Sequence, residues 1–207
     1  MKKSAYDKQL IELSLAEHLF LAEEYEKALE PNLRIGRGLY ELFDFNSALK
    51  FTDRAKICAE KMNNIEKLVE SLNQIGEILQ SLFRYQEALA SHKKGIKIAK
   101  EFGYKRGEAQ SLHQIGRVYE FTNRSKEALE SYKQSLDISR EIGYIEGEAR
   151  TLHNLGLVYQ ETNCFDEALV SYQQSLEIEK KMGNRMGEVQ SLHQIGMVYQ
   201  DTKRLDD

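Results

Sequence analysis

The chain has 207 residues, of which 41% are hydrophobic and 30% charged, a balance that excludes disordered and fibrous proteins and allows a buried core. Its 29 basic and 33 acidic residues are interspersed and give a formal net charge of -4. Because no run of lysine and arginine could follow a phosphate backbone, nucleic acid is not an expected partner.

The first segment, residues 1–26, is predicted to be a helical cap. Glu12, Glu17 and His18 interrupt its apolar residues, so neither a signal peptide nor a membrane span is expected. The chain's two cysteines form no CxxC motif, and we expect both to fill helix faces in a reducing cytoplasm. The apolar residues that the cap could bury are Leu10, Ile11, Leu13, Leu15, Leu19 and Phe20.

The distribution of proline and glycine predicts an almost wholly helical chain. Pro31 is the one proline, and the stretches between glycines lack the alternation typical of strands. Gly103, Gly143 and Gly183 recur every forty residues, and each is followed four residues later by a second glycine. We expect both glycines of each pair to mark helix ends.

A forty-residue repeat covers the chain after this segment. Residues 107–146 and 147–186 are identical at 20 of 40 aligned positions. A further copy begins with GEVQSLHQIG at residue 187, and two earlier copies keep the same frame more loosely. The predicted units are 27–66, 67–106, 107–146, 147–186 and the first helix of a fifth unit, 187–207.

Each unit is predicted to be a hairpin of two helices. Leu112, Ile115 and Tyr119 recur at helical spacing over about residues 108–121. A second apolar face follows over about residues 125–141, and the three residues between the two faces favour a turn. The chain therefore has to pack helix against helix throughout.

Glycines inside the first helices predict close contacts. A glycine such as Gly116 costs about 1 kcal/mol relative to alanine in a helix, so its recurrence at Gly156 suggests that something approaches closely. We expect Ala128 and Ala168 of the second helices to supply the other side of these contacts. Pro31 is expected in the first turn of the earliest first helix, where its missing N–H is harmless.

The repeated pattern L-x2-[IL]-G-x2-Y…A-x3-Y resembles the tetratricopeptide repeat. Leucine stands where the family has tryptophan, and the closing proline is absent. The forty-residue period is similar to the extended variant of Pins/LGN-type adaptors and bacterial multi-repeat signalling proteins. The first two units depart further at Leu39, Leu79, Thr52 and His92. The pattern is carried by Leu112, Ile115, Gly116, Tyr119, Ala128 and Tyr132, and again by Leu152, Leu155, Gly156, Tyr159, Ala168 and Tyr172.

The resemblance implies an all-α fold, a right-handed superhelical solenoid of antiparallel helix hairpins whose first helices line a concave groove. It places the recurring histidines His113, His153 and His193 on the groove face, each beside an amide side chain. Amides carry both donors and acceptors, which suits an extended peptide backbone. The alternative is that these residues persist only because the copies have not diverged, and bond to an adjacent helix.

The groove residues that this interpretation assigns to peptide binding include the histidines, the amides and the variable positions around them. They are Arg37, Glu70, Asn73, Gln74, Glu77, Gln110, His113, Gln114, Arg117, Arg150, His153, Asn154, Leu157, Gln190, His193, Gln194 and Met197.

A metal centre and an enzyme are the competing hypotheses. Equivalent side chains on successive first helices lie roughly 8 to 10 Å or more apart, whereas zinc holds its nitrogen ligands at about 2.0 to 2.1 Å. The three histidines therefore cannot share one ion. The sequence also lacks a nucleotide-binding glycine loop, a nucleophile motif and HExxH. We expect no metal, no cofactor and no catalysis.

The last segment, DTKRLDD, ends before the second helix of the fifth unit. Leu192, Ile195 and Tyr199 would then lack their helical partner, and solenoids normally need a polar cap. We expect either a fragment of a longer protein, which we favour, or self-association through this end. The predicted function is that of a cytoplasmic scaffold or adaptor for protein-protein interaction, which binds an extended peptide or a helix of its partner in the concave groove. A peptide-responsive sensor controlling an effector domain outside this chain is the alternative.

Overall fold

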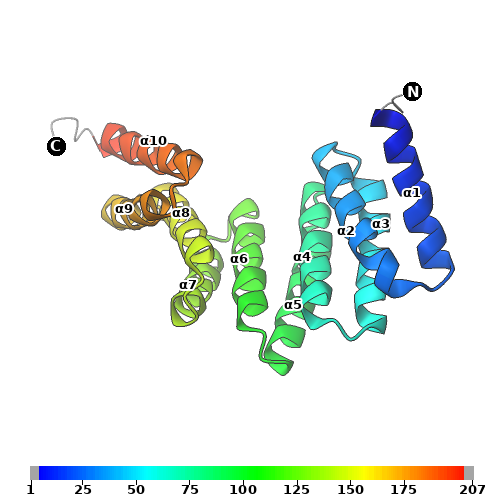
Figure 1. Ribbon diagram of the computed structural model, residues 1–207. Helices are drawn as coiled ribbons and strands as arrows, with labels where there is room; N and C mark the ends of the chain where they lie inside the picture. Colours follow the sequence, from blue (N-terminus) through cyan, green and yellow to red (C-terminus); the bar gives the residue numbers. More distant parts are fainter. Residues whose placement is uncertain (1–4, 203–207) are drawn as a thin grey trace. The chain divides into compact units, whose positions relative to one another are not determined.

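The protein is all-helical over the part that its computed structural model describes, residues 5–202, with side chains from residue 11 onward. No strand occurs in this range, which confirms the predicted all-α class (Figure 1). The helices are α1 (Ala5–Leu21), α2 (Tyr25–Glu41), α3 (Phe45–Lys61), α4 (Ile65–Ser81), α5 (Tyr85–Glu101), α6 (Lys105–Phe121), α7 (Ser125–Glu141), α8 (Ile145–Glu161), α9 (Phe165–Met182) and α10 (Arg185–Thr202).

The helices follow one another at a constant spacing. Each of α2 to α10 begins twenty residues after the helix before it, so two helices and their turns make up the forty-residue repeat. Turns this short make neighbouring helices antiparallel. α1 begins at Ala5 and keeps the same spacing, so the segment 1–26 continues a frame that its sequence does not show.

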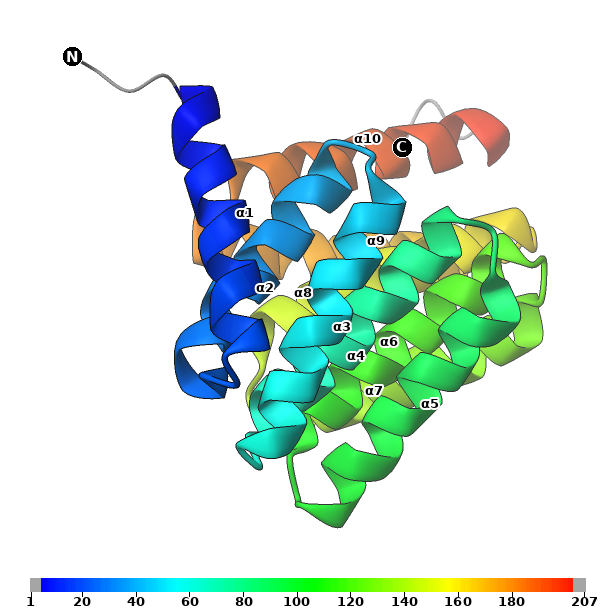
Figure 2. The ribbon, with the colours of Figure 1, turned by 90° about the vertical axis from the view of Figure 1, so that its right-hand side faces the viewer.

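The chain divides into two compact units, Met1–Gly107 and Glu108–Asp207. In the first unit α2 packs against α3, α3 against α4 and α4 against α5, and Figure 2 shows these four helices side by side. In the second unit α7 packs against α8, α8 against α9 and α9 against α10.

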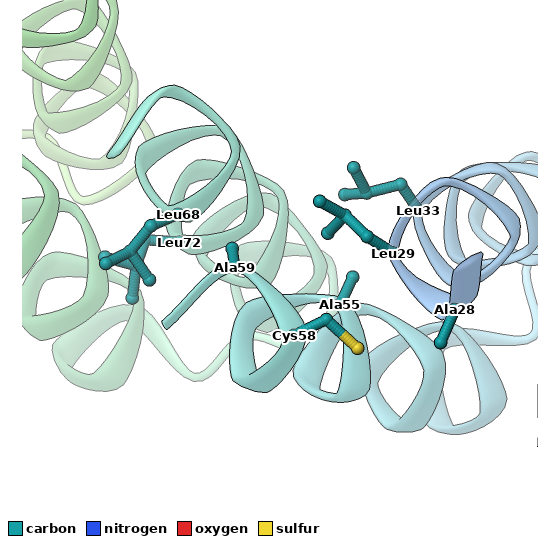
Figure 3. Close-up of a cluster of buried hydrophobic side chains, with 8 residues drawn as sticks. All are labelled: Ala28, Leu29, Leu33, Ala55, Cys58, Ala59, Leu68 and Leu72. Atoms are coloured by element: carbon teal, nitrogen blue, oxygen red, sulfur yellow. The ribbon is translucent and has the colours of Figure 1, made fainter. Parts of the chain in front are cut away.

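Each unit has its own apolar core. In the first unit, side chains of α2, α3 and α4 meet in the cluster drawn in Figure 3: Ala28, Leu29, Leu33, Ala55, Cys58, Ala59, Leu68 and Leu72. In the second unit, α7 and α8 share Ala128, Tyr132, Leu136, Leu152, Leu155 and Val158. Small residues recur where two helices touch, which allows their backbones to approach.

The two cysteines have different surroundings. Cys58 is fully buried in the first core, as predicted for a helix face, and burial raises the pKa of its thiol to about 11. Cys164 precedes α9 as its N-cap residue and is half-buried, so its predicted place on a helix face is wrong.

The turn conformation explains the first glycine of each pair. Gly103, Gly143 and Gly183 have φ of 68°, 66° and 70°, a left-handed conformation that confirms them as helix ends. The second glycines do not end helices. Gly107 and Gly147 lie inside α6 and α8, near the starts of these helices. Glycine is needed at both positions because a Cβ would overlap the ring of the tyrosine three residues earlier.

Gly116 and Gly156, in the middle of α6 and α8, face tyrosine rings, which corrects the predicted contact with alanine. A Cβ on Gly116 would lie 2.5 Å from Tyr132 Cε1, and one on Gly156 would lie 2.5 Å from Tyr172 Cε1. Both tyrosines are fully buried. Each tyrosine of α7 or α9 therefore packs its ring directly on the backbone of the preceding helix.

Pro31 lies inside α2 and not in its first turn, since the helix already begins at Tyr25. The first helix bond of α2 runs from the Ala28 N–H to the Glu24 carbonyl. Because proline has no N–H, Pro31 cannot donate the helix hydrogen bond to the Lys27 carbonyl that any other residue at this position would supply.

No helix within residues 5–202 combines the length and the apolar character needed to cross a lipid bilayer. The predicted right-handed superhelix concerns the arrangement of the units along the whole chain and stays a prediction.

The contact between Gly156 and Tyr172 gives a first prediction. Gly156→Ala should lower the free energy of unfolding by about 1 to 3 kcal/mol, because the added methyl group would overpack against a buried ring. Gly196→Ala is the matched control, since no described atom lies within 4 Å of its added Cβ. That variant should be neutral or gain up to about 1 kcal/mol of helix propensity. Urea unfolding measures both, and equal midpoints for the two variants would contradict the contact.

A second prediction concerns Phe83, which has a φ of 60° and a side chain that is 79% exposed. The equivalent residue one repeat later is Asn123, which tolerates this conformation better. Phe83→Asn should therefore raise the urea midpoint, by up to about 1 kcal/mol in free energy. Phe121→Asn, at an exposed residue inside α6, should not. A lower midpoint for Phe83→Asn would show that its edge-on contact with Tyr85 outweighs the strain.

Candidate functional site

The candidate residues of the first unit are engaged in helix packing. Arg37 of α2 donates to Glu70 of α4 at 3.0 Å, an ion pair between exposed and half-exposed side chains. Asn73 and Gln74 are buried in α4, and Asn73 Oδ1 lies 3.0 Å from His92 Nδ1 of α5. Glu77 is half-buried on the same helix. The two cavities described in this unit are lined by other residues.

The candidate residues of α6 are also bonded to their surroundings. His113 is only 3% exposed, and its Nδ1 lies 3.1 Å from Thr151 Oγ1 of α8. Arg117 donates to Gln114 Oε1 at 3.1 Å, and Gln110 donates to the Tyr144 hydroxyl at 3.4 Å. At this repeat the histidine bonds to an adjacent helix, as in the alternative interpretation of the repeated residues.

The candidate residues of α8 and α10 lie together around one surface cavity of about 740 Å³. This volume is typical of ligand pockets. The helix α9 and the turn before α10 complete its wall. Seven of the predicted groove residues line it: Arg150, His153, Asn154, Leu157, Gln190, His193 and Gln194. Met197 is exposed on α10 and does not line it.

The polar groups of this cavity are open on the α10 side. His193 and Gln190 are exposed and Gln194 is half-buried. On the α8 side, His153 is half-buried, and its ring lies edge-on to Tyr172 with centroids 5.6 Å apart. Burial lowers the pKa of His153, so its imidazole is neutral at pH 7. A neutral imidazole both donates and accepts a hydrogen bond.

Asn154 is held in place by a network that begins in the core. Tyr132 donates its hydroxyl hydrogen to Glu120 Oε2 at 2.7 Å, and Asn154 Nδ2 donates to the Tyr132 hydroxyl at 3.2 Å. Burial raises the pKa of both Glu120 and Tyr132. One amide N–H of Asn154 is thus used by the protein, and its orientation toward the cavity is fixed.

Sequence reasoning missed the wall that the second helix contributes. Ser175, Glu179 and Met182 of α9 line the cavity, as do Asn184 and Met186 near the start of α10. The resemblance drew attention to the first helices alone. One signal was available: Glu179 and Asn184 replace Ser139 and Tyr144 of the repeat before.

Among the side chains that the structure describes, those of residues 11–202, no three from His, Cys, Asp or Glu gather in a group that could hold a metal ion.

The comparison with known proteins agrees with the helical repeat fold. The sequence model of the tetratricopeptide repeat family matches residues 67–141 and 147–207, more than half of the chain. A search of curated proteins gave no match.

Several solved structures share the fold. BtubC from P. vanneervenii is 16% identical with a TM-score of 0.81, over 97% of this chain and 85% of that one. A Rap protein complexed with competence and sporulation factor is 15% identical with a TM-score of 0.75, over 95% of this chain and 60% of that one. A STAND (signal transduction ATPase with numerous domains) protein with a tetratricopeptide repeat sensor, from Pyrococcus horikoshii, is 16% identical with a TM-score of 0.70.

The alignment with the P. horikoshii protein covers 94% of this chain and 33% of that one, so this chain spans a third of its length. At these identities the likeness shows the fold alone, and none of the matches confirms the closer similarity to Pins/LGN-type adaptors. The helical hairpins, the forty-residue repeat and the family match agree, and the chain belongs to the tetratricopeptide repeat family.

Proposed function

We propose that this chain is a protein-interaction module that binds an extended peptide in the cavity between α8 and α10. Membership of the tetratricopeptide repeat family supports protein or peptide partners in general. The observation that carries the specific proposal is the gathering of histidine and amide side chains from two first helices around one cavity of about 740 Å³.

The chemistry of the cavity suits a peptide backbone. Gln190 and Gln194 make no hydrogen bond to the part of the protein whose side chains are described, so their donors and acceptors are available to a ligand. An extended peptide presents N–H and C=O groups in alternation, which side-chain amides can match. Arg150, Leu157 and Gln190 occupy positions that vary between repeats, and such positions give a groove its specificity.

The proposed binding set is narrower than the predicted one. Asn73, Gln74 and His113 are buried, and Arg37 is paired with Glu70. These residues stabilise the packing of first helices in our proposal, and the seven residues of the cavity bind the ligand.

A peptide-responsive sensor is the second candidate function. The P. horikoshii protein, whose fold is shared, carries a tetratricopeptide repeat sensor, and the Rap protein of similar fold was solved with competence and sporulation factor. In this reading, peptide binding changes the conformation of the chain and so controls an effector. Small-angle scattering with and without a bound peptide separates the two functions, since a rigid adaptor keeps its radius of gyration.

The third prediction tests the binding site. The double variant His193→Ala with Gln194→Ala should bind peptides selected by the wild-type chain from a random library at least about tenfold more weakly, because direct hydrogen bonds and contact area are lost. Its melting temperature should stay close to that of the wild type, since His193 is exposed and Gln194 makes no hydrogen bond within the described residues. The measurement is fluorescence anisotropy of the labelled peptides.

The control for this variant is Gln110→Ala with Gln114→Ala, which changes the same kind of side chain on α6, away from the cavity. Equal weakening by the two variants would place the peptide elsewhere. A library from which the wild-type chain selects no peptide would overturn the proposed function itself. His153→Ala is a poorer test, because it would also remove the contact with the buried Tyr172 ring.

A further inference from the structure

One position in the second unit shows how the repeat normally fills the space beside a first helix. The ring of Tyr144 lies over Gly147 of α8, where a Cβ would overlap it, and Ser139 Oγ lies 3.1 Å from the same point. The Tyr144 hydroxyl accepts hydrogen bonds from Gln110 and Arg150, both at 3.4 Å. The tyrosine thus closes the space between α6, α7 and α8.

The same space is occupied differently one repeat later. Gly187 is retained, but Asn184 stands in place of the tyrosine and caps α10 by accepting from the Gly187 N–H at 3.3 Å. Glu179 stands in place of Ser139, and its carboxyl group lies over Gly187, with Oε2 2.5 Å from the point where a Cβ would be. Both residues line the cavity. The cavity therefore exists where a ring has been exchanged for a carboxylate.

One oxygen of the Glu179 carboxylate is buried without a hydrogen-bond partner. The residue is 9% exposed, and its Oε2 is inaccessible and accepts no hydrogen bond within the described residues. An unpaired charge out of water is destabilising. The position of Glu179 adds to the destabilisation, because the residue lies in the last turn of α9, where the helix dipole favours positive charge. The fold gains nothing from a carboxylate here, which favours a role in binding.

The serine hydroxyls nearby cannot satisfy it. Ser175 donates to the Ala149 carbonyl at 3.0 Å, and Ser191 lies 3.5 Å from Ser175. The other charged residues of the cavity are Glu146 and Arg150, so the two carboxylates outnumber the one guanidinium group. A ligand with a positive charge and hydrogen-bond donors would compensate both the excess charge and the missing hydrogen bonds.

The remaining wall is apolar. Leu157, Met182 and Met186 line the cavity, and the two methionines are 39% and 69% exposed. Methionine adapts its shape to different ligands. An apolar wall beside a buried carboxylate matches a side chain whose methylenes are apolar and whose end is charged.

We propose that the cavity is a subsite for an arginine or lysine side chain of the bound peptide, whose charged end pairs with Glu179 while its methylenes pack on Leu157 and Met182. This assignment rests on the proposed peptide-binding function and names the residue type that the cavity selects.

The experiment uses four acetylated and amidated pentapeptides, Ala-Ala-Xaa-Ala-Ala, in which Xaa is arginine, lysine, citrulline or norleucine. They are titrated into the full chain at low ionic strength, and binding is followed through the amide NMR signals of Asn184 and Gly187. The arginine and lysine peptides should give saturable shifts, and the two neutral peptides should bind at least about tenfold more weakly. Citrulline has nearly the shape of arginine, so the comparison isolates the charge.

Two variants complete the test. Glu179→Gln keeps the shape of the side chain and should weaken the arginine peptide at least about tenfold. Asn184→Tyr restores the residue found one repeat earlier and should weaken binding, because its ring would compete with the Glu179 carboxyl group for the space over Gly187. Both should retain the helical circular dichroism of the wild type. Glu179→Gln should keep or exceed its melting temperature, since an unpaired charge is removed. Asn184→Tyr should not exceed it, since this variant loses the hydrogen bond that caps α10.

Equal binding of the arginine and citrulline peptides would overturn the proposal, as would an unchanged affinity of Glu179→Gln for the arginine peptide. The absence of saturable binding by all four peptides would also overturn it. An unblocked norleucine peptide that binds as well as the blocked arginine peptide would assign the subsite to a terminal ammonium group and so overturn the side-chain assignment. Library-selected peptides that bind Glu179→Gln and the wild type equally would reject this subsite and leave the proposed function standing.

Discussion

The packing of a tyrosine ring against a helical glycine is the contact on which the hairpins of the second unit depend. Tyr132 and Tyr172 reach the backbone of the helix before them because Gly116 and Gly156 leave room for their rings. Each ring is fully buried, and each hydroxyl donates to the side chain of the penultimate residue of that helix, Glu120 Oε2 or Gln160 Oε1. The tyrosine therefore fixes both the distance between the two helices and their register. An apolar ring of the same size would supply the first constraint and lose the second.

This contact connects the core to the candidate site. The hydroxyl of Tyr132 also accepts from Asn154 of the next first helix, and the ring of Tyr172 supports His153. The residues that carry the repeat pattern and those that line the cavity are thus neighbours in one network. Side chains held in this way lose less conformational freedom when a ligand binds, which favours affinity.

The helices could be predicted well from the sequence, because the spacing of apolar residues and the glycines at helix ends are local properties. Gly103 ends a helix through its own backbone conformation, and this could be read directly. Gly107 could not, because its reason is the ring of Tyr104, and the same letters fit a turn and a tight contact equally well. Pro31 shows that a local rule can also mislead. The preference of proline for the first turn of a helix placed Pro31 there, although α2 begins earlier, at Tyr25.

The candidate site was only partly predictable for a similar reason. His113, His153 and His193 occupy the same position of the repeat, yet the first is buried, the second half-buried and the third exposed. His113 is covered by Thr151 of the next first helix, whereas no first helix follows His193 within the described residues. The amide positions likewise identified the helices that line the cavity, while Glu179 on the second helix became visible only when the packed structure showed a carboxylate lying over Gly187.

The exchange of Tyr144 for Asn184 between two successive repeats also has a genetic aspect. The codons for tyrosine and asparagine differ in their first base alone, so one nucleotide substitution is enough to interconvert these residues. The glycine that receives the ring is present at Gly107, Gly147 and Gly187, whether or not a ring covers it. An array built in this way can open or close a cavity at any of these repeats without redesigning its helices. Ligand specificity in such a protein can therefore evolve faster than its architecture.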